Sequence, residues 1–131
     1  GVYRVQAAIA ARHARAKRFE ETDWAGIDAL YATLERLQPS PVVTLNRAVA
    51  VSKTRGPQAA LDMIEPLAER LSAYFHFHGT RGWLLLLLDR RREAREAFDR
   101  AIGLANTAAE AAHIRMHIDR LIAESEKSKG A

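Results

Sequence analysis

The chain has 131 residues, enough for one domain that buries a hydrophobic core without covalent cross-links. Hydrophobic residues make up 48% and charged residues 27% of it, which is typical of a soluble globular protein, and the longest apolar run, residues 83–88, is far too short to span a bilayer. The absence of cysteine excludes disulfides and thiolate metal sites and favours a cytoplasmic protein, while a net charge of +4 suits an acidic partner.

The first part of the chain is predicted to form three helices separated by capping and breaking residues. Residues 2–19 are rich in alanine and contain no glycine or proline, which favours one long helix. Asp23 is placed as the N-cap of a helix over residues 24–37. Proline at position 41 fits the first turn of a third helix, over residues 41–54.

Four further helices are predicted in the rest of the chain. Gly56 ends one helix and Pro57 opens the next, which is expected to run to about residue 71. A fifth helix is expected over residues 73–88, where five consecutive leucines need cover on more than one side. The remaining segments are a sixth helix over residues 92–105, a seventh over 107–125 that completes a single domain over residues 1–125, and a disordered tail over residues 126–131.

Apolar and small residues recur every 33–34 positions. The matching sets are Ile27, Ala60 and Ala94, then Tyr31, Ile64 and Phe98, then Leu34, Leu67 and Ala101. This period is typical of tetratricopeptide helix–turn–helix repeats, in which such residues form one stripe of a helix. The sequence therefore predicts an all-α, tetratricopeptide-like fold of about seven antiparallel helices in a right-handed superhelix. Trp24, Tyr31, Ile64 and Phe98 are expected in its core.

Histidine pairs raise the question of a metal site. His113 and His117 share one face of a predicted helix, but no third ligand is evident nearby, and Arg115 opposes a cation. His76 and His78 are two residues apart, so on a helix they point in different directions. The sequence also lacks a glycine-framed nucleophile and a phosphate-binding loop. We therefore expect no enzyme activity, no metal and no cofactor.

The helix over residues 41–54 carries polar residues beside an apolar side. Two interpretations of Asn46 and Arg47 fit equally well: they face a ligand groove, or they bond a neighbouring helix or loop. With the first helix expected to lie beside this one, the predicted partner-binding residues are Arg12, His13, Asn46, Arg47 and Lys53. This cationic patch suits an acidic partner, because arginine holds a carboxylate with two hydrogen bonds.

The first predicted helix is strongly basic. Residues 1–19 carry five lysines and arginines and no acidic residue. Such a helix is a solvated face, or it meets nucleic acid or an acidic domain. Direct DNA binding is the least expected of these, because the basic groups are few and lack aromatic partners for stacking bases.

Several segments of the chain resemble one family. They are residues 6–11 (QAAIAA), 22–24 (TDW), 40–51 (SPVVTLNRAVAV), 56–57 (GP) with the histidine-rich helix that follows, and 93–98 (EAREAF). Together they resemble the carboxyl-terminal tetratricopeptide-like extension of a group of extracytoplasmic-function sigma factors of bacterial RNA polymerase. The resemblance covers residues 3–121 and is most specific over residues 40–51. The chain departs from the family at Asp89, where glycine is usual, and at Gly79 and Gly82, where leucine or alanine is common.

The resemblance implies a role in transcription initiation. In that family, two amino-terminal helical domains bind core polymerase and the promoter, and the extension regulates them. This chain would be the regulatory fragment of a longer sigma factor. Its partners would be the sigma factor's amino-terminal domains, core RNA polymerase or both, with DNA bound only through the missing domains and no membrane involved. The alternative is a free-standing adaptor that binds a peptide in its concave groove.

Overall fold

The computed structural model describes the backbone of residues 1–19 and 23–130, and the side chains of residues 1–11, 23–119 and 123. Over these residues the chain forms seven α-helices and one short 3-10 helix, and it has no strand. The predicted all-α fold class is confirmed. No helix in this part of the chain has both the length and the apolar character needed to cross a bilayer.

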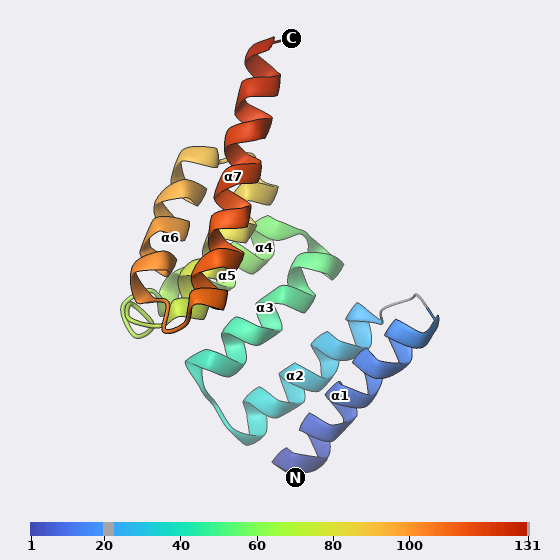
Figure 1. The fold of residues 1–131 in the computed structure, drawn as a ribbon. Coiled ribbons are helices and arrows are strands. Elements are labelled where there is room, and N and C mark those ends of the chain that lie inside the picture. Colours follow the sequence, from blue (N-terminus) through green and yellow to red (C-terminus); the bar gives the residue numbers. More distant parts are fainter. Residues whose placement is uncertain (20–22, 131) are drawn as a thin grey trace. The chain divides into compact units, whose positions relative to one another are not determined.

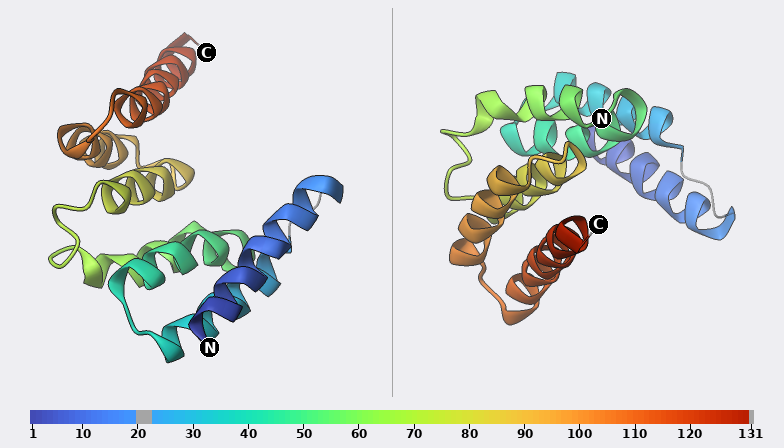
Figure 2. Two further views of the ribbon diagram at one scale, coloured as in Figure 1. Left: turned by 60° about the horizontal axis from the view of Figure 1, so that its bottom comes forward. Right: turned by 90° about the horizontal axis from the view of Figure 1, so that it is seen from above.

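The helices fall into two compact units, residues 1–67 and 68–131 (Figure 1). The first contains α1 (Val2–Phe19), α2 (Trp24–Leu37), α3 (Pro41–Arg55), α4 (Pro57–Ile64) and the 3-10 helix η1 (Glu65–Leu67), and the second contains α5 (Phe75–Leu87), α6 (Arg91–Leu104) and α7 (Ala108–Gly130). Within the first unit, α1, α2 and α3 run in alternating directions (Figures 1 and 2). The single domain, the tetratricopeptide-like arrangement and the superhelix stay predictions.

Local capping explains where α2 and α3 begin. The Asp23 carboxylate accepts a hydrogen bond from the Gly26 backbone N–H at 3.0 Å, as predicted for an N-cap. The Ser40 hydroxyl accepts one from the Val42 N–H at 3.2 Å, one residue before the proline that opens α3. These bonds satisfy backbone donors that the first turn of each helix leaves without a partner.

The fourth helix is shorter than predicted, and proline explains the difference. Gly56, with φ of 93°, separates α3 from α4 as expected. However, α4 ends at Ile64 instead of near residue 71, and the chain continues as η1. Glu65 still has helical backbone angles, but Pro66 has no N–H with which to make the next helical hydrogen bond, to the Asp62 carbonyl. The expected end near residue 71 is therefore wrong.

The turn between α5 and α6 is a Schellman motif. The Arg90 N–H donates to the Leu85 carbonyl at 2.9 Å, and the Asp89 N–H donates to the Leu86 carbonyl at 3.0 Å. The motif places Asp89 in the left-handed region, with φ of 59°. Glycine is preferred at this position because it has no Cβ. The backbone conformation thus accounts for the glycine that the resembling family usually has here.

The last helix extends past its predicted end. We expected a helix up to residue 125 and a disordered tail over residues 126–131, but α7 continues to Gly130. Alanine, glutamate and lysine are good helix formers and dominate residues 123–127, and no proline interrupts the segment. Residues 126–130 are therefore helical, and residue 131 lies outside the described residues.

Most of the repeated positions are buried. Seven of them have relative exposures of 3% or less in α2, α4 and α6, namely Ile27, Leu34, Ala60, Ile64, Ala94, Phe98 and Ala101. Two members of the expected core differ: Trp24 and Tyr31 are only half-buried. Both lie on α2 where it meets α3, and the space between the two helices leaves their rings partly open. Their assignment to the core is wrong.

Helices α5 and α6 pack closely because α5 lacks a side chain at Gly82. A Cβ built at this position would lie 2.5 Å from Cε1 of Phe98, whose side chain is fully buried. Leu84 and Leu85 are buried as well. Leu87, by contrast, is 51% exposed, so the prediction that the leucine run is covered on more than one side does not hold along its whole length.

Candidate functional site

Helix α3 presents its polar residues on two different faces. Asn46 and Lys53 are seven residues apart and therefore share one face. Arg47 and Arg55 lie on another face, together with Val51. The predicted patch contains Asn46, Arg47 and Lys53 together, but the structure gives the two faces different surroundings.

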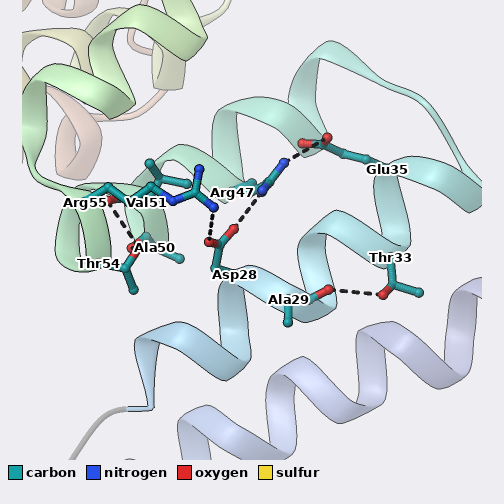
Figure 3. A network of polar contacts seen from close by, with 9 residues as sticks. All are labelled: Asp28, Ala29, Thr33, Glu35, Arg47, Ala50, Val51, Thr54 and Arg55. Carbon is teal, nitrogen blue, oxygen red and sulfur yellow. Dashed lines mark hydrogen bonds and ion pairs between the residues drawn. The ribbon is translucent and has the colours of Figure 1, made fainter.

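The Arg47 face forms ion pairs with α2 (Figure 3). Arg47 Nε donates to Asp28 Oδ1 at 2.6 Å, and Arg47 Nη1 lies 3.5 Å from Glu35 Oε2. Arg55 Nη2 lies 3.4 Å from the other Asp28 oxygen, Oδ2. We call these four residues the α2–α3 ionic cluster. The Asp28 carboxylate thus joins α2 to α3, because each of its two oxygens contacts a different arginine of α3.

Hydrogen bonding and burial act in opposite directions on the pKa of Arg47. The Asp28 side chain is 9% exposed and that of Arg47 is 21% exposed. The hydrogen bond to Asp28 raises the pKa of Arg47 above its usual value, and it outweighs burial, which lowers that pKa. Arg47 is therefore held charged against α2. Of the two interpretations of this residue, the geometry favours the bond to a neighbouring helix.

The Asn46 face borders a groove between α2 and α3. The groove has a volume of about 190 Å³, and its lining residues are Trp24, Ile27, Tyr31, Asn46, Val49 and Ala50. Ile27 and Ala50 are each 1% exposed and form its floor. We call this feature the α2–α3 groove. Its lining is apolar and aromatic, with a single amide side chain.

Two details define the electrostatics of the α2–α3 groove. Nζ of Lys53 lies 5.9 Å from the centroid of the Trp24 ring, a distance at which a cation is attracted to the ring face. Burial raises the pKa of the Tyr31 phenol, so this group stays neutral at physiological pH. The groove therefore has an apolar interior and, at Lys53, one positively charged edge.

The other predicted partner-binding residues are on α1. The side chains of Arg12 and His13 lie outside the described residues. In the described part of the chain, α1 packs extensively on α2, and α2 on α3, while α1 and α3 are not among the pairs in extensive contact. The expected side-by-side placement of the first and third helices is thus not what the packing shows. The structure brings together Asn46 and Lys53 and separates Arg47 from them.

The four histidines whose side chains are described lie against other rings. His117 stacks on Phe98 with ring centroids 5.4 Å apart, and His113 meets His117 edge-on at 4.9 Å. His78 is buried, with Nε2 2.7 Å from the Ser72 carbonyl oxygen, whereas His76 is exposed. Within the described side chains, no three His, Cys, Asp or Glu residues come together in a way that could hold a metal ion.

Sequence reasoning missed the acidic half of the ionic cluster and the aromatic walls of the groove. Asp28 and Glu35 are seven residues apart, so they share a face of α2, and this spacing was a signal for a basic partner opposite them. Trp24 and Tyr31 also share a face at the same spacing. Their apolar character looks like core in the sequence, and only the packing of α3 shows that their rings stay partly open.

The comparisons with known proteins find a relative that is much longer than this chain. No protein-family model matches it, and no solved structure matches it either. An uncharacterized protein of Rhizobium meliloti (strain 1021) is 69% identical over 124 residues, which is 95% of this chain but 29% of that protein. The chain thus spans less than a third of the length of this relative.

Proposed function

We propose that the chain is a non-catalytic regulatory domain of a bacterial sigma factor, with a tetratricopeptide-like arrangement, that acts by binding the sigma factor's other domains or core RNA polymerase. The observation that carries the proposal is the resemblance over residues 40–51, which form most of α3. This stretch supplies both the Arg47 ion pairs and the Asn46 edge of the groove.

Two further observations support this proposal. The buried residues that recur in α2, α4 and α6 fit a helical repeat, a class of fold that mainly binds other proteins. The Rhizobium relative extends well beyond the matching region, which leaves room for further domains in that protein.

The proposal is tested by binding. The chain would be immobilised and presented with two analytes: the remainder of the Rhizobium protein produced without the matching region, and core RNA polymerase from the same bacterium. We expect saturable binding of at least one of them. Phe98→Ala, which removes a fully buried ring and costs about 3–5 kcal/mol of stability, shows whether binding needs the folded chain. Binding of neither analyte would contradict the proposal.

The second candidate, a free-standing adaptor for peptides, is favoured by one observation, the α2–α3 groove with its aromatic walls. In the same assay, an adaptor would bind neither the remainder of the protein nor polymerase, and it would capture short peptides instead. Transcription from a sigma-dependent promoter would then be unaffected by deletion of the matching region from the longer protein.

A further inference from the structure

The α2–α3 groove has the size and lining to receive one bulky apolar side chain. A closed apolar cavity of about 150 Å³ accommodates benzene, and this groove measures about 190 Å³. The rings of Trp24 and Tyr31 form its walls, and Ile27 and Ala50 form a buried floor. Aromatic walls of this kind give large contact areas at a low cost in side-chain entropy.

The rim of the groove supplies the groups that recognise a peptide backbone. The side chain of Asn46 is exposed and carries both an amide donor and a carbonyl acceptor. A peptide unit offers the complementary acceptor and donor, so one asparagine can hold an extended backbone beside the groove. The other lining side chains are apolar or aromatic, which leaves Asn46 as the amide that orients the occupant.

The charge beside the groove favours an occupant that carries negative charge. Helix α3, which forms one side of the groove, contains three lysines and arginines and no aspartate or glutamate. Two of these, Arg47 and Arg55, are paired with carboxylates of α2. Lys53 lies next to the groove, with its Nζ over the ring of Trp24. A carboxylate on the occupant would therefore meet the Lys53 cation at this edge of the groove.

We propose that the α2–α3 groove binds an acidic peptide segment of the protein partner by enclosing one bulky apolar side chain of that segment. The inference rests on the proposed function, because it names the chemistry of the partner in that interaction. Trp24 and Tyr31 contact the apolar side chain, Asn46 holds the backbone, and Lys53 attracts the flanking carboxylates. Arg47 is a positioning residue: it holds α3 against α2 and so fixes the width of the groove.

The fluorescence of Trp24 reports on occupancy directly. In a Trp83→Phe chain, Trp24 is the single tryptophan, so its emission follows the groove. The probes are three seven-residue peptides. The first has a central leucine flanked by glutamate and aspartate. The second has the same flanking residues and a central glycine, and the third has a central leucine flanked by lysine. We expect saturable emission changes with the first peptide, and at least tenfold weaker binding of the other two. Equal binding of all three peptides, or no change with any, would overturn the inference.

Matched variants test whether Lys53 and Asn46, at the edge of the groove, contribute to peptide binding. Lys53→Glu reverses a charge beside the groove, and Arg100→Glu makes the same change at an exposed position of α6 in the second unit. We expect Lys53→Glu to weaken binding of the acidic peptide at least tenfold. Arg100→Glu should leave the affinity within twofold of the wild-type value. Asn46→Ala should weaken it several-fold. If Lys53→Glu reduces the helical content of the chain, Lys53→Gln replaces it, and an unchanged affinity in that folded variant counts against the inference.

The outcomes separate the inference from the proposed function. If the wild-type chain binds the remainder of the longer protein or polymerase, and Asn46→Ala and Lys53→Glu bind equally well, the function stands and the groove is not the site. If the wild-type chain binds neither, the function itself fails. If a second copy of the chain fills the groove instead, sedimentation experiments should show dimers, and Lys53→Glu should dissociate them. This result would overturn the assignment of an acidic segment as the occupant.

Discussion

Asp28 connects two helices through one buried carboxylate. Its two oxygens face different arginines of α3, and its side chain is 9% exposed. A carboxylate in such a position costs free energy to bury unless it is paired, so the arrangement depends on its partners being present. Arg47 therefore matters for the packing of α2 on α3 as well as for the charge of the surface.

Replacement of Arg47 by alanine is expected to lower the free energy of unfolding by about 2 kcal/mol, because it leaves Asp28 buried with only a longer contact to Arg55. Arg55→Ala is the control: its side chain is 60% exposed, and we expect a loss of about 0.5 kcal/mol. Urea unfolding measures both. Equal stability of Arg47→Ala and the wild-type chain would show that Arg47 does not stabilise the fold and is available to a partner.

Asp89 illustrates a backbone cost at a single residue. It occupies the left-handed position of the Schellman motif, and its carboxylate lies 3.0 Å from Nε of Arg91. Asp89→Gly should raise the free energy of unfolding by about 0.5 kcal/mol, since relief of the left-handed conformation exceeds the loss of an exposed ion pair. Asp89→Val should lower it by about 1–2 kcal/mol. Thermal unfolding of both variants tests the order, and a valine variant as stable as the glycine variant would refute it.

At the level of the helix, α5 contains two glycines with opposite consequences. The missing Cβ of Gly82 lets the Phe98 ring lie against the α5 backbone. At Gly79, a Cβ would meet Cδ1 of Ile114 at 3.5 Å, an ordinary van der Waals distance. Glycine thus serves close packing at one position, and at the other it only lowers helix propensity.

Alanine substitutions distinguish these two glycines. Gly82→Ala should destabilise the chain by about 1–3 kcal/mol, because the fully buried Phe98 ring has to move. Gly79→Ala should stabilise it by about 0.5–1 kcal/mol through improved helix propensity. Gly103→Ala in α6 is the control for propensity alone, since no atom lies within 4 Å of its built Cβ. Similar changes at positions 79 and 82 would contradict the close approach of α6.

The helices show which elements a sequence can predict. The starts of α2 and α3 were predictable because the capping oxygens of Asp23 and Ser40 belong to the same few residues as the helix. The early end of α4 is predictable as well, because Pro66 lies two residues after Ile64 and cannot donate a helical hydrogen bond. The groove could not be predicted from the sequence, because Trp24 looks like a core residue until the position of α3 is known. The pairing of Arg47 with Asp28 likewise joins residues 19 positions apart.

At the level of the whole molecule, the distribution of charge gives the proposed partner its chemistry. The eight basic residues of α1 and α3 have no acidic residue within those helices. Since the Debye length falls from about 10 Å at 0.1 M salt to about 3 Å at 1 M, binding of an acidic partner should weaken roughly tenfold or more over that range. Titrations at several salt concentrations measure the effect, with helical content as the control for folding. Affinity independent of salt would mean that apolar contacts alone carry the binding.

The uneven burial along the chain also sets how readily each helix opens. Among the described side chains of α1, Ile9 is the one that is buried, whereas α5 and α6 bury Phe77, Leu84 and Phe98 almost completely. Backbone amides in α5 and α6 should therefore exchange with deuterium slowly, and those of α1 should exchange through frequent local unfolding. A helix that opens at little free-energy cost can refold against another surface, so a marked slowing of amide exchange in α1 after the partner binds would show that the interface extends beyond the α2–α3 groove.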